Sequence, residues 1–320
     1  MKNIVGKAFT ALVIFCALVI ALLAIVFKIK YFVPELKAPE IKNPELYIKN
    51  SEGKINTIKQ DCEKKIIWAN KNKDKTKFSL VYIPGFSATR KEIFPVMETL
   101  AKDLGLNLFL SRFPYHGENN PEAYKNLTAQ DLFDTAVEAY EIGKELGDEV
   151  IMIGTSTGAV MISQLSVWQK EIKAMVLISP AFNIMPWATE TLASPLGNII
   201  NKLANDEYRT WEPKNPDIKK YWDTKYHRDA IPELMRAIYY VDSHNFVQIK
   251  NPTLMIYTKE DKIISLKEVE KKFAEIGSPR KKLILMPSPS HVLAGEFTSP
   301  QTTQLVIGEI KEWLEYQGVK

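Results

Sequence analysis

The chain has 320 residues, of which 46% are hydrophobic and 25% charged, and its formal net charge is +4. This length and apolar content suffice for one large α/β domain with an insertion. The modest charge is spread along the chain and gives no case for nucleic-acid binding. The lysine-rich residues 71–77 lack interleaved aromatic side chains, so we interpret them as a solvated loop.

The amino terminus contains an uncharged run of 19 residues, 9–27, with lysines on both sides. As a helix this run would measure about 28 Å, close to the roughly 30 Å of a hydrocarbon core. Residues 1–30 are therefore expected to form an N-terminal transmembrane helix that anchors the chain in a membrane. A removed signal peptide and a buried soluble helix are the alternatives. The bulky residues before Lys28 make a poor cleavage site, and the short basic leader favours a domain outside the cytoplasm.

Residues 31–77 are expected to be a tether and an N-terminal extension. Three prolines within residues 33–44 suit an extended tether. Residues 46–70 are ambiguous, with a weak helix or a hairpin followed by an early strand at 65–69 as the possible arrangements.

From residue 78 onward, short apolar strands alternate with helical patterns. This alternation predicts an α/β fold, with a mostly parallel sheet and helices on both faces. The core is expected in two parts, residues 78–181 and 251–320. The expected strands are 78–83, 106–110, 150–153, 174–180, 253–257 and 282–286, and the expected helices are 91–104, 131–146 and 304–316.

Residues 182–250 interrupt this alternation and are expected to form a helical cap insertion. An insertion near the carboxyl ends of parallel strands lies over the edge where such sheets bind ligands. We expect its aromatic side chains both to line an apolar pocket and to form a small core of their own. These side chains are Trp187, Trp211, Tyr221, Trp222, Tyr226, Tyr239 and Tyr240.

The most specific motif is Gly154-Thr155-Ser156-Thr157-Gly158, which follows an apolar strand and precedes a helix-compatible run. The pattern G-x-S-x-G is typical of a nucleophile elbow. A serine at the tip of a sharp strand-to-helix turn leaves little room two positions away, and glycine provides that room because it lacks a Cβ. The turn also directs the Thr157 N–H towards a forming oxyanion.

A serine nucleophile needs a histidine base and a carboxylate, and both follow later strands. His291 lies in a short polar loop after the last expected strand, and Asp261 follows the strand before it. Serine, acid, histidine is the chain order of α/β hydrolases. Asp261 is favoured over Glu260 because it adjoins the apolar Ile263, which would seat the loop.

The second oxyanion donor is expected from the loop after the first core strand. Phe86 in the segment 84–88 is the candidate, through its backbone N–H. A histidine also occurs at position 116, after the next strand, and we interpret His116 as structural.

Segments 83–89, 112–117 and 154–158 together resemble the α/β-hydrolase superfamily, above all its carboxylesterase, monoacylglycerol-lipase and lysophospholipase-like members. The similarity covers the chain from residue 78 to its end. The resemblance implies an α/β-hydrolase fold. It also implies roles for five residues: Ser156 as nucleophile, Asp261 as acid, His291 as base, and Phe86 and Thr157 as oxyanion donors.

Two positions depart from the pattern of this superfamily. Its members typically carry His-Gly-Phe at the first site and Arg-x-x-Gly-His-Gly at the second. Here Pro84 replaces the histidine and Tyr115 replaces the glycine. Neither change removes a catalytic atom, because the oxyanion hole uses backbone groups, but both affect the shape of the loops.

The sequence therefore predicts a membrane-anchored serine hydrolase that cleaves lipid-like or other apolar carboxylic esters through an acyl-enzyme. No metal or organic cofactor is expected, and the expected partners are a small-molecule acyl ester and the membrane. An acyltransferase or thioesterase with the same triad is the alternative within enzymes. A non-catalytic binding module is the alternative outside them.

Overall fold

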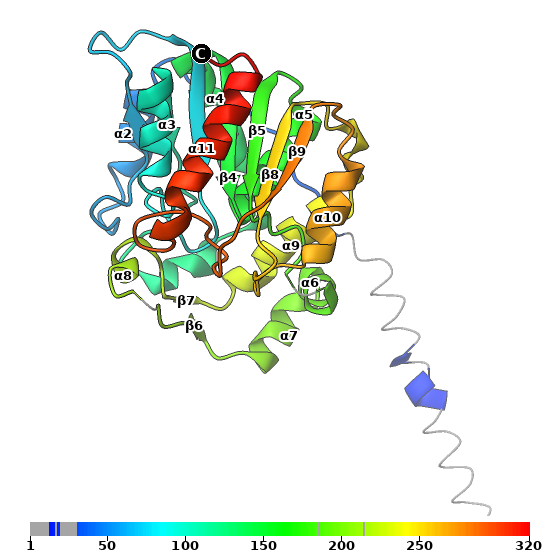
Figure 1. Ribbon diagram of the computed structural model, residues 1–320. Helices are drawn as coiled ribbons and strands as arrows, with labels where there is room; N and C mark the ends of the chain where they lie inside the picture. Colours follow the sequence, from blue (N-terminus) through cyan, green and yellow to red (C-terminus); the bar gives the residue numbers. More distant parts are fainter. Residues whose placement is uncertain (1–12, 17, 20–30, 185, 214) are drawn as a thin grey trace, which may run out of the picture.

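The computed structural model describes residues 13–16, 18–19, 31–184, 186–213 and 215–320 (Figure 1). Most of the expected transmembrane segment, residues 9–27, lies outside this part, so that expectation stays a prediction. Within the described residues, no helix is both long enough and apolar enough to cross a bilayer.

A seven-stranded sheet with the order β1-β3-β2-β4-β5-β8-β9 forms the centre of the domain. Every neighbouring pair is parallel except β1 with β3. The expected mostly parallel sheet is thus confirmed. Its strands are β1 (Lys65–Ile67), β2 (Thr76–Ile83), β3 (Asn107–Leu110), β4 (Gly147–Thr155), β5 (Ile172–Ile178), β8 (Thr253–Tyr257) and β9 (Lys281–Leu285).

Helices cover both faces of the sheet and bury its alternating side chains. On one face, α3 (Val96–Leu104) and α11 (Pro300–Tyr316) pack on a core that includes Leu80 and Tyr82 of β2. On the other face, Val81 and Ile83 join a core with side chains of α4 (Ala129–Leu146), α5 (Thr157–Trp168) and α10 (Leu266–Glu275). Figure 1 shows α3 and α11 in front of the strands. Burial on both faces explains why the central strands are apolar throughout.

Helix starts differ from the expected ones for local reasons. α3 begins at Val96 and not at residue 91, because Pro95 disfavours helical backbone at the residue before it. Residues 91–95 form turns instead. α4 begins at Ala129, two residues early, because Thr128 and Asp131 form a capping box. The ambiguous segment near residue 46 forms the helix α2 (Pro44–Glu52).

The insertion between β5 and β8 is not helical throughout, in contrast to the expectation. Two three-residue strands within it pair antiparallel, with Tyr208 opposite His227. Pro213 and Pro216, which lie between these strands, interrupt any continuous helix. The insertion contains α6 (Pro186–Ala193), α7 (Gly197–Ala204), β6 (Tyr208–Thr210), α8 (Ile218–Tyr221), β7 (Lys225–His227), α9 (Ala230–Asp242) and the 3₁₀ helix η2 (Phe246–Gln248).

The expected tether is extended, and it lies against α4. The ring of Phe32 stacks on that of Phe133 with centroids 5.9 Å apart. The side-chain amide of Gln130 bonds both the N–H and the carbonyl of Glu35, at 2.9 and 2.8 Å. Tyr31 also lies beside Tyr239 of α9, with centroids 5.0 Å apart. The tether is thus in contact with the domain from Tyr31 onward.

Candidate active site

Ser156 lies in a strained turn between β4 and α5. Its φ of 53° and ψ of −115° are unusual for a residue with a Cβ, and such backbone costs of order 1–3 kcal/mol. The Ser156 N–H donates to the Ile178 carbonyl at 2.8 Å, which ties the turn to β5. The side chain is nearly buried, with the residue 9% exposed.

The two glycines of the motif allow α5 to approach the sheet closely. A Cβ on Gly158 would lie 2.1 Å from the Ile83 carbonyl oxygen and 2.6 Å from that of Pro84. A Cβ on Gly154 would lie 2.7 Å from the Ala159 nitrogen. These distances are below any real Cβ contact with backbone atoms, so the turn requires glycine at both positions.

His291 and Asp261 meet in the loops after β9 and β8. His291 Nδ1 lies 2.6 Å from Asp261 Oδ2, and Asp261 Oδ1 accepts from the Ile263 N–H at 2.8 Å and the Ile264 N–H at 3.3 Å. Burial by itself would raise the pKa of the Asp261 carboxyl. The bond with His291 and the two backbone donors outweigh burial and hold this pKa below its usual value.

An ionised Asp261 determines the tautomer of His291. A carboxylate only accepts hydrogen bonds, so Nδ1 of His291 carries the proton and Nε2 is left as an acceptor. The neighbouring Glu260 is exposed. Of the two acidic residues considered from the sequence, Asp261 is thus the one that bonds His291.

Ser156 lies next to the loop that follows β2. A Cβ built on Gly85 would lie 3.2 Å from Ser156 Cβ and 2.8 Å from Glu92 Oε1. Burial raises the pKa of the Glu92 carboxyl above its usual value, against the opposing effects of its bonds with Gly85 and Tyr82 and of the nearby His291. The described residues contain no hydrogen bond between the Ser156 hydroxyl and His291. Such bonds are often long without substrate.

Two hydrogen bonds fix the backbone of Gly85, the residue before Phe86. The Gly85 N–H donates to Glu92 Oε2 at 2.8 Å, and its carbonyl accepts from the Ala88 N–H at 3.3 Å. Because C=O and N–H of a trans peptide point in opposite directions, the Phe86 N–H faces away from this turn. Among the described residues, neither the Phe86 nor the Thr157 N–H donates to another group.

Aromatic side chains of the core and the insertion meet at Phe86. Its ring lies edge-on to His116 at 4.9 Å, to Tyr124 at 5.9 Å and to Tyr226 of β7 at 5.5 Å. Trp222 packs with Ala88 in the same loop. The insertion therefore contacts the loop that carries the candidate oxyanion donor.

His116 and Tyr115 shape this region from the loop after β3. Burial lowers the pKa of His116 to about 3, and its Nδ1 donates to the Pro114 carbonyl at 2.9 Å. These contacts are those of a neutral structural histidine. Tyr115 has a φ of 67°, a left-handed conformation that favours glycine. A glycine, as in the superfamily pattern given above, would adopt this backbone freely, whereas Tyr115 bears roughly 1–2 kcal/mol of strain.

Sequence reasoning missed Glu92, which touches both Gly85 and Tyr82. It falls within the expected helix 91–104, where the sequence analysis assigns it no role. A signal was present, because Glu92 is in phase with the apolar Val96 and Leu100 at four-residue spacing. A carboxylate in a buried stripe needs polar partners.

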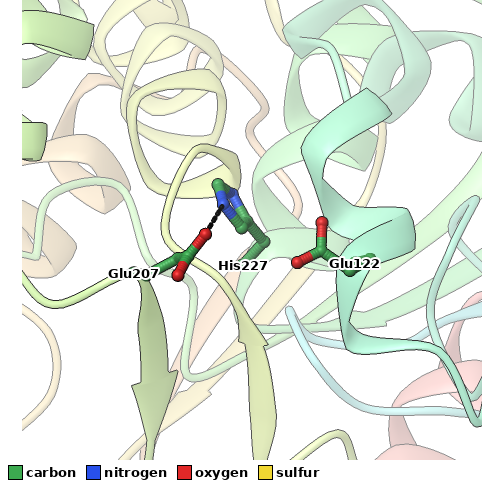
Figure 2. Close-up of side chains that lie close together, drawn as sticks. All are labelled: Glu122, Glu207 and His227. Atoms are coloured by element: carbon green, nitrogen blue, oxygen red, sulfur yellow. Dashed lines mark ion pairs between the residues drawn. The ribbon is translucent and has the colours of Figure 1, made fainter.

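A second cluster joins the insertion to the 3₁₀ helix η1 (Pro121–Asn126). Polar atoms of Glu122, Glu207 and His227 lie within 4.8 Å of one another, and His227 Nε2 is 3.9 Å from Glu207 Oε1 (Figure 2). Glu122 already accepts from the Tyr208 hydroxyl and from Lys125. His227 Nδ1 accepts from the Asp229 N–H at 3.2 Å, which leaves the proton on Nε2. We therefore describe this group as a hydrogen-bonded junction and assign it no metal.

Comparisons with known proteins place the site in context. A family model described as serine aminopeptidase, S33, matches residues 116–298, which is more than half of the chain. This span includes Ser156, Asp261 and His291. Among curated protein sequences, none matches the chain significantly.

Solved structures with this fold include several lipolytic enzymes. One, described under LipS and LipT, two metagenome-derived lipolytic enzymes, has a TM-score of 0.68 and 17% identity, covering 81% of this chain and 99% of its own. A monoacylglycerol lipase from Paleococcus ferrophilus has a TM-score of 0.61 and 15% identity, and the match covers 79% of this chain and 98% of that one. A soluble variant of monoglyceride lipase from Saccharomyces cerevisiae has a TM-score of 0.55 and 16% identity, and the match covers 91% of this chain and 97% of that one. At these identities the likeness shows the α/β-hydrolase fold.

Replacing Gly158 by alanine is expected to disrupt the turn. The new methyl would overlap two carbonyl oxygens of β2 and its loop, so unfolding free energy should fall by about 2 kcal/mol or more. Gly308→Ala is the matched control, because nothing lies within 4 Å of its Cβ position in α11. The unfolding free energy of this control should rise by roughly 0.5–1 kcal/mol. Equal urea midpoints for Gly158→Ala and the parent would contradict the close approach.

The lowered pKa of Asp261 links stability to pH. A carboxyl with a depressed folded pKa stabilises the fold above its unfolded pKa of about 3.9, and this contribution is lost as pH falls through the folded pKa. Urea unfolding of the parent and Asp261→Asn should therefore differ most above about pH 4 and converge in stronger acid. Glu260→Gln, a change at the exposed neighbour, is the control. If the difference in unfolding free energy between the parent and Asp261→Asn grew on acidification, a lowered pKa of Asp261 would be contradicted.

Proposed function

The chain belongs to the serine aminopeptidase S33 family of α/β hydrolases, and from this premise we propose that it is a serine hydrolase of carboxylic esters with lipid-like or other apolar acyl groups. One observation carries the proposal. His291 and Asp261 are hydrogen-bonded at 2.6 Å, and their loops follow strands of the same sheet that presents Ser156 in a strained turn.

The proposed reaction proceeds through an acyl-enzyme. Nε2 of His291 accepts the proton of Ser156 as Oγ attacks the acyl carbonyl, and Asp261 stabilises the imidazolium that forms. The Phe86 and Thr157 N–H groups donate to the oxyanion. The imidazolium then protonates the leaving alcohol, and a water activated by the same histidine releases the acid. Each oxyanion donor is worth about 3 kcal/mol in the transition state.

The preference for apolar esters rests on the surroundings of Phe86. Its ring and those of Tyr124 and Tyr226 form an aromatic group beside the proposed oxyanion hole. Such side chains suit an acyl chain better than a charged substrate. Solved structures of the same fold are described as a lipolytic enzyme and as monoacylglycerol lipases, which supports the same class of substrate.

Turnover of p-nitrophenyl acyl esters should depend on Ser156. Ser156→Ala removes the nucleophile and is expected to lower kcat by about four decades or more. Ser51→Ala, a change at an exposed hydroxyl that bonds only its own helix, is the control and should keep parental activity. The measurement is initial rate against acyl chains of increasing length, together with labelling by a fluorophosphonate.

Two results would contradict the ester proposal. Equal rates for the parent and Ser156→Ala would remove Ser156 as the nucleophile. Serine-dependent cleavage of an aminoacyl p-nitroanilide, with no cleavage of any ester, would assign the peptide chemistry that the name of the family describes. Both substrates are therefore assayed with the same preparations.

We also propose that residues 1–30 anchor the chain in a membrane, with the catalytic domain outside the cytoplasm. The uncharged run at residues 9–27 supports the anchor. Removal of residues 1–30 should give a folded domain with parental kcat, because the contacts described for the tether begin at Tyr31. The full chain should remain with membranes during alkaline extraction. Release of the full chain by alkali, or failure of the shortened chain to fold, would contradict the proposal.

A further inference from the structure

Glu92 is a buried carboxylate that takes no part in the mechanism above. The residue is only 2% exposed and lies in the turn before α3. Its Oε2 accepts from the Gly85 N–H at 2.8 Å and from the Tyr82 hydroxyl at 2.7 Å. Both donors belong to β2 and the loop that follows it. One oxygen atom thus fixes the end of β2 to the start of the candidate oxyanion loop.

Tyr82 extends this contact to the nucleophile turn. Its hydroxyl also lies 3.0 Å from Thr155 Oγ1, on the residue before Ser156. Because a tyrosine hydroxyl has one proton, the side chains of Thr155, Tyr82 and Glu92 form a single hydrogen-bonded chain. Buried chains of this kind stiffen the segments they join.

The backbone around Glu92 contacts the loop that follows His291. A Cβ on Gly295, whose φ is 118°, would lie only 2.6 Å from the Glu92 carbonyl oxygen. The Phe94 carbonyl accepts from the Glu296 N–H at 2.8 Å. The turn that holds Glu92 is therefore in contact with the loops of Phe86 and His291, and it reaches the Ser156 turn through Tyr82.

We propose that Glu92 is a positioning residue that holds the Phe86 N–H in the orientation needed for an oxyanion beside Ser156. The proposal rests on the serine-hydrolase function given above. Without the Glu92 acceptor, the Gly85 N–H loses its partner, and only the bond from the Ala88 N–H to the Gly85 carbonyl, at 3.3 Å, still orients the peptide that carries the Phe86 N–H. An oxyanion donor acts on the transition state and barely on bound ester, so its displacement lowers kcat and leaves KM nearly unchanged.

The test compares variants that remove or keep the acceptor. Glu92→Met fills a similar volume without an acceptor and should lower kcat for a p-nitrophenyl ester by about 30-fold or more, with KM within about threefold. Glu92→Gln keeps one acceptor oxygen and should recover kcat to within about fivefold of the parent. Glu98→Met is the matched control. It is also a glutamate-to-methionine change, but it lies on α3, and the Glu98 side chain makes no hydrogen bond to the site. It should keep parental kcat.

A double variant tests the chain itself. Tyr82→Phe removes only the hydroxyl and should lower kcat about threefold. In the double variant Tyr82→Phe/Glu92→Gln, the fold reduction in kcat should be smaller than the product of the two single reductions. A folded Glu92→Met with kcat within twofold of the parent would overturn the proposal. If Glu92→Met does not fold, Tyr82→Phe decides, and parental kcat for that variant would overturn it.

Ser156→Ala separates this proposal from the proposed function. If that variant retains the ester turnover of the parent, the serine mechanism fails. The role proposed for Glu92 then fails with it, because that role depends on an oxyanion beside Ser156. If Ser156→Ala is inactive and Glu92→Met is folded and fully active, the serine mechanism stands and the role of Glu92 fails.

Discussion

The approach of α5 to the end of β2 is the constraint on which the rest of the site depends. Gly158 lies so close to the Ile83 and Pro84 carbonyl oxygens that no Cβ fits between them. This contact holds Ser156 in backbone that would otherwise relax, and it keeps the first turn of α5 beside the loop after β2. The strain of order 1–3 kcal/mol is thus opposed by the packing of α5 against the end of β2 and in the core on that face of the sheet.

The parallel strand order brings the other candidate site residues to the same carboxyl-terminal end of the sheet. β2, β4, β8 and β9 all point one way, so the loops of Phe86, Ser156, Asp261 and His291 leave the sheet on one side. Each loop is then fixed by polar contacts of its own, such as the backbone donors to Asp261 and the Glu92 bond to Gly85. Strand direction gives proximity, and buried hydrogen bonds give orientation.

The sequence was sufficient for the sheet because each central strand is an apolar run between turn signals. It also predicted Asp261 and His291 as partners, from chain order and from their places in loops after the last two strands, and the structure places them in hydrogen-bond contact. Their catalytic roles, and those of Ser156, Phe86 and Thr157, stay predictions. Glu92 was not predictable in this way, because its contacts with Tyr82 of β2 and with Gly85 depend on the path of the intervening loop, which the whole fold determines. The start of α3 was missed because the restriction imposed by Pro95 was not weighed against the apolar pattern.

The most direct test of the account is to find which residue carries the acyl group during turnover. The protein is mixed with a p-nitrophenyl ester, quenched in acid within the first turnovers, digested and analysed by peptide mass spectrometry. The account predicts an acyl mass on the peptide that contains Ser156, with His291→Ala abolishing it. An acyl group on another residue, or ester turnover without any acylated peptide, would contradict the account.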